Sequence, residues 1–393
     1  METKRSLKIL ISHPSPDLYG SDLQLLETIE GLTHAGHAVH VALPASGPLE
    51  TLIAERGGVV KLVKFPVSRK SLLSPRGLPK YFIDTFISLF AIWRMMRAIK
   101  PEIVYANTLT TPVWFLAAKL YGVPLVCHVH EAEESARKSV ALLLTVPLLL
   151  CNAVIVNSKA SRQVIEMAVP RLRSRIKLIY NGIPHSGQKP APVGNGFAGQ
   201  TRVVMVGRLS PRKGTDVALE AVAKLVQTGN DVSLTLCGDI YPGYEWFAAE
   251  LERRANAPDL QGRINFAGYR DDVANQLALS EVVIVPSLTE PFGNVAVEAQ
   301  LANRPVVASN VQGLAEIITD GSTGILSEPG NPSALADAIS KLMTDRDQAQ
   351  RMADAAYASA TRRFSVARYQ ADIVELSEQT ASGNSTGGIR RAK

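Results

Sequence analysis

The strongest chemical signal in the sequence is a pair of glutamates that follows one predicted strand. The apolar strand Val282–Pro286 leads into the segment Glu290-Pro291-Phe292-Gly293-Asn294, and a helix beginning near Gly293 carries Glu298. This spacing predicts backbone N–H groups and the positive end of a helix dipole beside one carboxylate, with the second about one turn inside the helix. Each carboxylate can accept paired hydrogen bonds from neighbouring sugar hydroxyls, one on a hexose and the other on a ribose. The structural alternative is that acidic residues near a helix start simply favour its dipole.

Two basic residues follow the first predicted strand of the second half of the chain. Strand Arg202–Gly207 leads into a loop that carries Arg208 and Lys213 before the next helix. A diphosphate leaving group needs a guanidinium that binds two oxygens at once and a mobile ammonium that neutralises its developing charge. Solvated surface cations are the alternative. Both residues nevertheless lie after a strand, where ligands bind in open α/β sheets, and this favours the functional interpretation.

His130 ends the predicted strand Leu125–Val129 in the first half of the chain, and Glu131 follows it. From this position an imidazole can hydrogen-bond a sugar near the reacting carbon or shield a developing positive charge. A core histidine whose hydrogen bonds are satisfied within the fold is the structural alternative. His128 shares the strand face of His130, and we expect it to have a structural role.

Three glycine-containing turns give weaker signals. Gly20 opens a predicted helix after strand Lys8–Ser12, where a backbone can approach a phosphate or an acceptor, and a plain helix cap is an equal alternative. The segment Gly268-Tyr269-Arg270 follows a strand, and its backbone groups could pair with a nucleobase. The loop Asn310–Glu316 ends in a carboxylate. The last two segments are supporting context only.

These motifs resemble those of the retaining GT-B glycosyltransferases of family 4. The resemblance rests on Gly207-Arg208-Leu209 with a downstream Lys213-Gly214, on the Glu-Pro-Phe-Gly loop, and on the glutamate eight residues after Glu290. It covers the chain from Lys8 to about Glu378. Relatives usually carry two glycines where this chain has Gly20-Ser21, and often a second glycine where it has Gln312-Gly313.

The resemblance implies a role for most of these side chains. Glu290 would contact the transferred sugar, Glu298 would hold the ribose, and the motif's histidine followed by an acidic residue matches His130-Glu131. The implied ligands of the diphosphate and sugar are Arg208 and Lys213 by their side chains, and Gly293 and Asn294 by their backbone amides.

The reaction that the resemblance implies is transfer of a hexose from a UDP-linked or GDP-linked sugar with retention of anomeric configuration. No metal or other cofactor is expected, because Arg208, Lys213 and helix amides supply the positive charge that a divalent ion supplies elsewhere. No carboxylate is obviously placed as a nucleophile beneath the sugar. We therefore expect front-side attack, with the leaving diphosphate helping to take the proton of the acceptor, and with Glu290 and His130 positioning the sugar.

Two other classes of function are alternatives to this one. A nicotinamide or flavin oxidoreductase needs a Gly-x-Gly-x-x-Gly turn after a strand, and none follows Lys8–Ser12 or Arg202–Gly207. A Walker lysine motif is also missing from the sequence. A non-catalytic protein that binds sugar nucleotides is the other class, and the intact set of two glutamates and two cations argues against it.

Elements able to position these residues recur along the chain. Short β-rich apolar runs alternate with helical patterns, which predicts an α/β fold of two Rossmann-like, doubly wound domains facing a cleft. The predicted strands of the first half are Lys8–Ser12, Ala38–Leu43, Val59–Phe65, Ile103–Ala106, Leu125–Val129 and Ala153–Asn157. Those of the second half are Arg202–Gly207, Ser233–Gly238, Arg263–Ala267, Val282–Pro286, Pro305–Ser309 and Gly324–Leu326. The clearest helices of the second half are Thr215–Thr228, Tyr244–Ala255, Val295–Leu301 and Pro332–Thr344.

The predicted domain organisation follows from these elements and from a length of 393 residues, which exceeds what one hydrophobic core usually serves. We predict an acceptor-binding domain over 1–185, a Pro/Gly-rich linker over 186–200, and a nucleotide-sugar-binding domain over 201–362. A helix over 363–379, after a break near Phe364-Ser365, would return to the first domain, and the polar residues 380–393 would form a disordered tail.

The amino-acid composition indicates which cellular compartment and which classes of binding partner to expect. The net charge is +6 with a pI of about 9.2, and the basic residues are dispersed, unlike those of a nucleic-acid-binding tail. The three cysteines, Cys127, Cys151 and Cys237, lie far apart in apolar runs, which indicates buried thiols in a reducing compartment. The amino terminus lacks the apolar stretch of a secretion signal, so a cytoplasmic location is expected.

Two segments have features that are also found in membrane-spanning or membrane-binding sequences. Val140–Val156 approaches the length of a membrane span, but Pro147 and Asn152 interrupt it. A helix over Ser139–Leu150 followed by a strand over Ala153–Val156 explains the same residues.

Ser68–Lys100 combines seven basic residues with large apolar side chains at helical spacing, which suggests contact with an anionic membrane and a lipid-linked acceptor. This would fit synthesis of a cell-envelope or exported polysaccharide at the inner face of the membrane. The alternatives are an amphipathic helix packed on its own domain and a small soluble acceptor.

Overall fold

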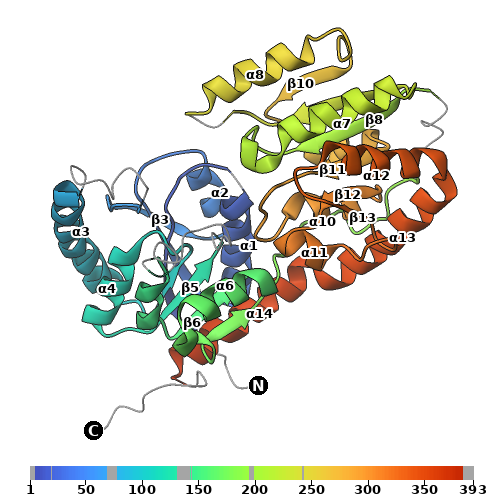
Figure 1. Cartoon of the computed structure of the whole chain (residues 1–393). Coiled ribbons are helices and arrows are strands. Elements are labelled where there is room, and N and C mark those ends of the chain that lie inside the picture. Colours follow the sequence, from blue (N-terminus) through green and yellow to red (C-terminus); the bar gives the residue numbers. More distant parts are fainter. Residues whose placement is uncertain are drawn as a thin grey trace. The chain divides into compact units, whose positions relative to one another are not determined.

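The computed structural model of the chain describes residues 5–18, 20–68, 78–130, 142, 144–193, 199–240 and 243–383. Its contacts divide the chain into two compact units, Met1–Gly182 with Val366–Lys393, and Ile183–Ser365. Each unit is built on one parallel sheet with helices packed against it (Figure 1). The predicted α/β architecture with two Rossmann-like domains is confirmed.

The sheet of the first unit has seven parallel strands in the order β3-β2-β1-β4-β5-β6-β7. Its strands are β1 (Lys8–Ser12), β2 (Ala38–Leu43), β3 (Val59–Leu62), β4 (Ile103–Ala106), β5 (Leu125–Val129), β6 (Ala153–Val156) and β7 (Ile176–Leu178). Strand β3 ends short of the predicted Phe65 because Leu62 pairs with Leu43, the last residue of β2, so no partner strand continues. Strand β7 was not predicted, since it is three residues long with exposed Lys177 at its centre.

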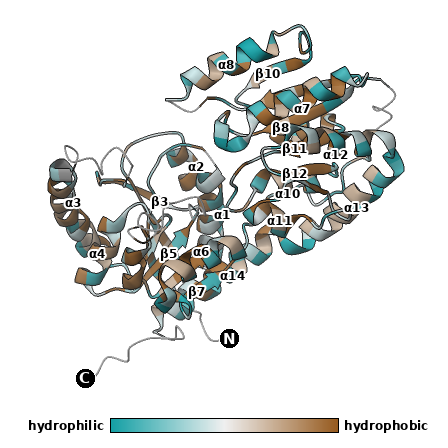
Figure 2. Ribbon diagram, in the orientation of Figure 1, coloured by the Kyte–Doolittle hydropathy of each residue, from teal (hydrophilic) through white to brown (hydrophobic). Residues whose placement is uncertain are grey.

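Helices cover both faces of this sheet because successive strand residues point to opposite sides. Ile9 and Ile11 of β1 join a core that includes residues of α1, α2 and α14, whereas Leu10 joins a separate core with residues of α3, α4 and α6. Strands β4, β5 and β6 in the interior of the sheet are accordingly buried along their length, and the interior strands are largely apolar in Figure 2. The helices of this unit are α1 (Gly20–His34), α2 (Leu49–Glu55), α3 (Leu78–Ile99), α4 (Pro112–Tyr121), η2 (Val146–Leu150), α6 (Lys159–Ala168), η3 (Pro170–Leu172) and α14 (Val366–Ala381).

Helix α14 comes from the far end of the chain and packs against α1 of the first unit. The two helices approach closely at Gly31, where an added Cβ would lie 2.7 Å from the Cβ of Gln370. The Tyr369 hydroxyl and the Thr28 hydroxyl form a buried hydrogen bond of 2.5 Å. The helix continues to Ala381, two residues into the segment predicted to be a disordered tail, and residues 384–393 of that segment lie outside the described residues.

The sheet of the second unit has six parallel strands in the order β10-β9-β8-β11-β12-β13. Its strands are β8 (Thr201–Val206), β9 (Val232–Cys237), β10 (Ile264–Gly268), β11 (Val282–Val285), β12 (Val306–Ser309) and β13 (Ile325–Ser327), each within one or two residues of the prediction. The helices are η5 (Pro211–Lys213), α7 (Thr215–Gln227), α8 (Glu245–Ala255), α9 (Val273–Leu279), α10 (Asn294–Leu301), α11 (Gln312–Ile317), α12 (Pro332–Thr344) and α13 (Arg346–Arg363).

Part of the predicted linker is tied to the second unit. The Val193 N–H donates to the side chain of Gln350 at 2.8 Å, and Arg304 donates to the Ala191 carbonyl at 2.9 Å. Residues 194–198 lie outside the described residues. The segment that starts after Ile183 therefore contributes packing to the second unit as well as connecting the chain.

The apolar segment Val140–Val156 forms β6 at its end, as predicted, but its last residues before β6 are the 3₁₀-helix η2 and not an α-helix. Pro147 near the start of η2 is suited to that first turn. Residues 139–141 and 143 lie outside the described residues. In the described part of the chain, no helix has both the length and the apolar character that crossing a bilayer requires. All three cysteines are buried free thiols, as predicted.

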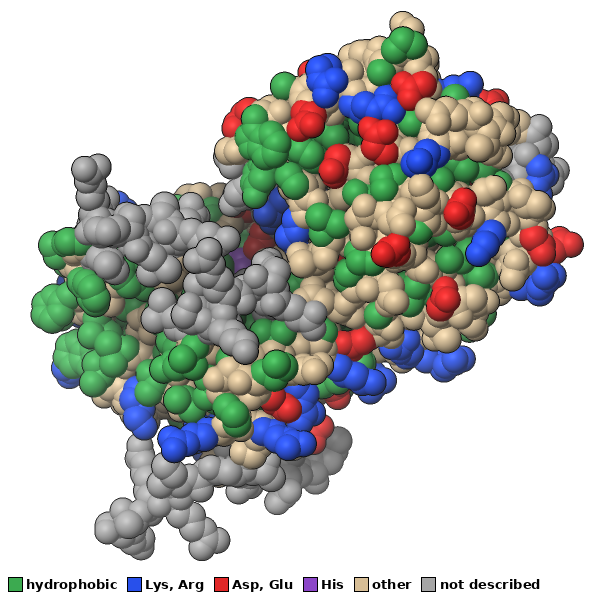
Figure 3. Space-filling view, in the orientation of Figure 1, with side chains coloured by type: hydrophobic (Ala, Val, Ile, Leu, Met, Phe, Trp, Pro, Cys, Tyr) green, Lys and Arg blue, Asp and Glu red, His purple; other side chains and the backbone are tan. Residues whose placement is uncertain are grey.

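Helix α3 has one face in the core and another in solvent. Ile92, Met96 and Ile99 are buried in the first unit. The opposite side exposes a group of large apolar side chains, which we call the α3 face: Phe82 (66% exposed), Ile83 (59%), Phe86 (77%), Ile87 (62%) and Phe90 (61%). Apolar side chains gather on the surface over α3 and α4 in Figure 3, and much of α3 is apolar in Figure 2.

The order of strands marks one point in each sheet where a ligand is expected. In the first sheet the connections leave in opposite directions from β1 and β4, and in the second from β8 and β11. Open α/β sheets bind ligands outside the carboxyl ends of such a pair of strands. The strand order alone therefore indicates a candidate ligand site in each unit, outside the carboxyl ends of β1 and β4 in one and of β8 and β11 in the other.

Candidate active site

The loop between β11 and α10 carries Glu290 at the carboxyl end of β11. Two glycines allow its backbone to lie tightly against α11. Gly293 has a φ of 113°, and a Cβ there would lie 2.6 Å from a side-chain carbon of Leu314. A Cβ at Gly313 would lie 2.3 Å from the carbonyl oxygen of Phe292, so any larger residue would displace the loop. The Glu290 backbone is thereby held in one position.

Hydrogen bonds hold Glu290 at its backbone and at its carboxylate. Its N–H donates to the Gln312 side-chain oxygen at 2.8 Å, and its carbonyl accepts from the Gly313 N–H at 3.1 Å. The carboxylate Oε2 lies 2.5 Å from Lys213 Nζ and accepts from the Ser287 hydroxyl at 3.1 Å. Burial raises the pKa of Glu290, but the charge and hydrogen bond of Lys213, with smaller contributions from Arg212 and Ser287, lower it overall below its usual value. The carboxylate is therefore ionised at neutral pH.

Lys213 reaches Glu290 because the loop after β8 packs against the end of β11. It ends the short helix η5, and the next residue, Gly214, has a φ of 70°. A Cβ at Gly214 would lie 2.1 Å from the Pro286 carbonyl oxygen, so only glycine allows this approach. The predicted cation and the predicted carboxylate thus meet as an ion pair where β8 and β11 lie side by side.

Glu298 lies in the second turn of α10, with its side chain partly buried. Burial raises its pKa to about 7, and the charge of Lys213 lowers it only in part. Lys213 thus acts electrostatically on both glutamates, so the structure brings Lys213, Glu290 and Glu298 into one neighbourhood.

The other residues predicted for this site occupy its surroundings. Arg208 is exposed and follows Gly207, where an added Cβ would lie 3.8 Å from Lys213 Cε. Gly293 and Asn294 form the amino-terminal end of α10, whose dipole favours anions. Tyr269 is 56% exposed after β10, but its N–H donates to the Asp239 carboxylate at 3.0 Å. That N–H is therefore engaged within the protein, and the pairing of the other backbone groups of this segment with a nucleobase stays a prediction.

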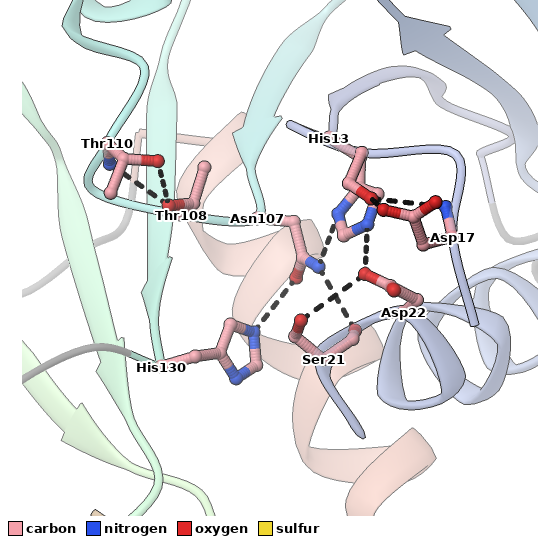
Figure 4. A network of polar contacts seen from close by, with 9 residues as sticks. His13, Asp17, Ser21, Asp22, Asn107, Thr108, Thr110 and His130 are labelled. Atoms are coloured by element: carbon pink, nitrogen blue, oxygen red, sulfur yellow. Dashed lines mark hydrogen bonds and ion pairs between the residues drawn. The ribbon is translucent and has the colours of Figure 1, made fainter. Parts of the chain in front are cut away.

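In the first unit, His130 belongs to a polar network at the carboxyl ends of β1, β4 and β5 (Figure 4). His13 Nε2 lies 2.7 Å from Asp22 Oδ1, and His13 Nδ1 lies 3.0 Å from the Asn107 amide nitrogen. The Asn107 amide oxygen lies 3.2 Å from His130 Nε2. Gly20 begins α1, two residues before Asp22, and is exposed. Glu131 lies outside the described residues.

The histidine at the end of β5 is neutral at physiological pH. Burial, and then the neighbouring His13, lower the pKa of His130 to about 3, with Asp22 opposing this in part. His128 is fully buried, and burial lowers its pKa well below the usual value. Its Nδ1 lies 2.9 Å from the Tyr105 hydroxyl, and its ring centroid lies 4.0 Å from that of His130. His128 is thus positioned to pack beneath His130.

Sequence reasoning missed five residues of these two networks: Ser287, Gln312, His13, Asp22 and Asn107. His13 and Asn107 directly follow β1 and β4, so the strand order would have identified them had it been known. Gln312 has a positive φ of 36°, which a sequence alone does not show for a non-glycine residue. Among the described residues, no three His, Cys, Asp or Glu side chains are grouped so that they could hold a metal ion.

Both halves of the chain match sequence profiles of glycosyltransferases. Residues 20–186 match the sequence profile described as Glycosyltransferase Family 4, and residues 192–359 match that of Glycosyl transferases group 1. An alpha-D-kanosaminyltransferase of Streptomyces kanamyceticus is 33% identical over 39% of each chain, so this match spans well under half of that protein. A D-inositol 3-phosphate glycosyltransferase of Corynebacterium urealyticum is 26% identical over 94% of each chain.

Among solved structures, HepE of Anabaena in complex with UDP-glucose superimposes with a TM-score of 0.81 at 27% identity, covering 95% of this chain and 100% of that one. Neighbours of this kind are GT-B glycosyltransferases. Because profiles of this group match both halves of the chain and the whole fold is shared, the protein belongs to the family 4, or group 1, glycosyltransferases of the GT-B fold.

Proposed function

We propose that the protein transfers a hexose from a nucleotide-diphosphate sugar to a glycan or lipid-linked acceptor, with retention of anomeric configuration. The observation that carries this proposal is the 2.5 Å pairing of the Lys213 ammonium with the Glu290 carboxylate where β8 and β11 meet. The complex of the similar HepE with UDP-glucose supports a UDP-linked donor. GDP-linked sugars are the alternative donors, and a direct comparison of the two distinguishes them.

Donor binding would exchange the partners of Lys213. Its ammonium leaves the Glu290 carboxylate and binds the diphosphate, together with the exposed guanidinium of Arg208. Glu290 is then able to accept hydrogen bonds from hydroxyls of the sugar, while Ser287 still holds it. The amino-terminal end of α10, with Gly293 and Asn294, adds a dipole that favours the anion, and Glu298 accepts from the ribose hydroxyls.

The chemical step breaks the bond between the anomeric carbon and the diphosphate oxygen, and the electron pair leaves with the diphosphate. The acceptor hydroxyl forms its new bond to the anomeric carbon on the same face, and its proton passes to an oxygen of the leaving diphosphate. Lys213 and Arg208 stabilise the charge that develops on that leaving group. Glu290 acts by positioning the sugar, since Ser287 holds its carboxylate and Gln312 and Gly313 hold its backbone.

This scheme uses two side-chain cations and a helix dipole where other transferases use a divalent ion. We therefore propose that transfer requires no metal and no other cofactor. An assay of donor hydrolysis, run with and without a chelator, tests this directly.

The donor proposal is tested with a panel of UDP- and GDP-linked sugars, by thermal-shift stabilisation and by slow donor hydrolysis. The key variant is Glu290→Gln, and Glu250→Gln on the exposed side of α8 is the matched control. In Glu290→Gln we expect kcat to fall about a hundredfold, while UDP affinity holds or rises because Lys213 is released. Equal losses of turnover and UDP affinity, or no stabilisation by any nucleotide sugar, would overturn the proposal.

The acceptor part of the proposal depends on the α3 face. Five apolar side chains, each more than half exposed, lie on one helix of the first unit, and Leu120 of the adjacent helix α4 is 65% exposed. Arg94, Arg97 and Lys100 are exposed near the carboxyl-terminal end of α3, and Arg97 lies 4.8 Å from the Trp93 ring centroid. Apolar and basic side chains together favour binding to an anionic bilayer surface. We propose that the protein works as a peripheral protein at the cytoplasmic face of the membrane, in cell-envelope or exopolysaccharide synthesis.

Sedimentation with vesicles containing phosphatidylglycerol tests this surface. The paired change Phe86→Ser with Phe90→Ser should reduce binding at least tenfold, because it removes two large exposed aromatic groups from the face. The control is Trp246→Ser, at a residue of α8 in the second unit that is 59% exposed. Equal binding of wild type and the paired variant, or transfer only to soluble acceptors, would contradict a membrane-linked acceptor.

A further inference from the structure

The network around His130 continues well beyond the histidine, through side chains that no proposed step has used. His13 is 0% exposed, Asp22 2% and Asn107 1%. They come from three separate elements, the ends of β1 and β4 and the first turn of α1, yet each bonds the next at 2.7 to 3.2 Å until His130 is reached. Figure 4 shows the four side chains forming one continuous chain of contacts. An unpaired polar group is costly when it is buried, so we expect each donor in this network to face an acceptor.

The direction of each hydrogen bond can be assigned by counting donors and acceptors. Oδ1 of Asp22 is a carboxylate oxygen and accepts, so His13 donates to it through Nε2–H. The other nitrogen, Nδ1, faces the Asn107 amide nitrogen, which carries only hydrogens, so Nδ1 accepts from it. The same amide nitrogen lies 3.5 Å from the Ser21 carbonyl, which also only accepts, and this fixes the orientation of the amide. The Asn107 oxygen therefore faces His130, which must donate to it through Nε2–H.

We infer that Asp22, His13 and Asn107 are positioning residues that hold His130 in one neutral tautomer, with its proton on Nε2 and its acceptor lone pair on Nδ1. Asp22 acts on the tautomer of His130 indirectly, through the side chains of His13 and Asn107. His130 is in this way prepared to accept a hydrogen bond at a fixed point, and it does not donate a proton from Nδ1.

The chemical consequence rests on the proposed function. A sugar offers hydroxyl donors, and an imidazole fixed with its lone pair on Nδ1 recognises a hydroxyl hydrogen at that position. The low pKa of His130, about 3, means that the ring stays neutral and does not act as a general acid at physiological pH. His130 thus orients a sugar hydroxyl.

Nitrogen-15 NMR of histidine-labelled protein, without any substrate, measures the tautomer directly. Wild-type His130, assigned by its loss in His130→Gln, should show protonated Nε2 and unprotonated Nδ1. In Asp22→Leu the acceptor for His13 is gone, so the proton of His13 is expected to move to Nδ1, the Asn107 amide to turn over, and His130 to become protonated at Nδ1. Asp22→Asn keeps an oxygen at the same place and should restore the wild-type pattern.

The control is Thr110→Val in the β4–α4 loop, whose hydroxyl bonds only Thr108 among the described contacts, and it should leave the His130 signals unchanged. If Asp22→Leu does not fold, Asn107→Leu is the second test, and it should give His130 a mixture of tautomers. Wild-type His130 protonated on Nδ1, or an unchanged pattern in both variants, would overturn the inference. Because this readout needs no sugar, it can fail or succeed independently of the proposed transferase activity.

A transferase assay adds the kinetic readout. Asp22→Leu should lower kcat about tenfold or more with a smaller change in donor KM, and Asp22→Asn should recover most of it. If the NMR pattern changes as expected while kcat does not, the tautomer is set by these residues but has no part in transfer, and the assignment as positioning residues for catalysis is wrong.

Discussion

Glu290 and Glu298 follow the same strand, yet the protein changes their pKa values in opposite directions. Lys213 contacts Glu290 directly and keeps its pKa low, although burial opposes this. Glu298 has no such contact, and burial raises its pKa from 4.5 to about 7. At neutral pH one carboxylate is therefore fully charged, while the other is about half protonated. A half-protonated carboxylate makes nucleotide binding sensitive to pH.

We predict that affinity for UDP rises with pH through the range 6 to 8 in the wild type and that this rise is lost in Glu298→Gln. Only the ionised carboxylate accepts from both ribose hydroxyls, so with a pKa of about 7 the competent fraction grows about tenfold over this range. Isothermal titration calorimetry of both proteins with the same nucleotide measures the difference, and protonation of UDP itself cancels between them. Parallel pH profiles would show that Glu298 does not contact the ribose as an ion.

The raised pKa of Glu298 makes the stability of the folded protein depend on pH in a defined direction. Between pH 4.5 and about 7 the unfolded chain loses the Glu298 proton while the folded protein retains it. Stability therefore decreases as pH rises through this window, and Glu298→Gln should flatten that decrease in urea unfolding at several pH values. A steeper decrease in the variant would contradict the raised pKa.

At the scale of elements, the sequence predicted most of the fold because buried parallel strands are continuous apolar runs. Strands β1, β2, β4 and β5 begin and end where they were predicted, as does α12. The short β7, α9 and α11 were missed, since each is held by tertiary packing and not by a strong local pattern. The glutamates and cations of the site were recognised from their motifs. The partners His13 and Asn107 were not, because their proximity depends on β1 lying beside β4.

The contact between α11 and the β11–α10 loop can be tested by a substitution at Gly313. Gly313→Ala adds a Cβ 2.3 Å from the Phe292 carbonyl oxygen, so the loop must move, and we expect a loss of about 1–3 kcal/mol in unfolding free energy. Displacing Glu290 should also lower kcat. Gly199→Ala is the control, because nothing lies within 4 Å of a Cβ there and its φ is not positive. Equal denaturation midpoints for the two variants would show that the loop tolerates the displacement.

At the scale of the whole molecule, the chain returns at its end to the unit in which it began. Tyr369, Ile373 and Leu376 of α14 are buried in the same core as Leu25 and Ile29 of α1, although more than three hundred residues separate them in sequence. The first unit therefore cannot complete this core until α14 has been synthesised. Damage to α14 should destabilise the unit that holds the His130 network and leave the other intact.

We predict that Ile373→Ala destabilises the first unit by about 2–5 kcal/mol, because it leaves a cavity in a fully buried site. Hydrogen exchange should become faster in peptides from α1, β1 and β2 and stay unchanged in β8, β9 and β11. Leu342→Ala, a buried residue of α12 in the second unit, should give the reverse pattern. Uniform acceleration across both units in either variant would mean that the two unfold as one cooperative body, and that closing the chain with α14 couples their stabilities.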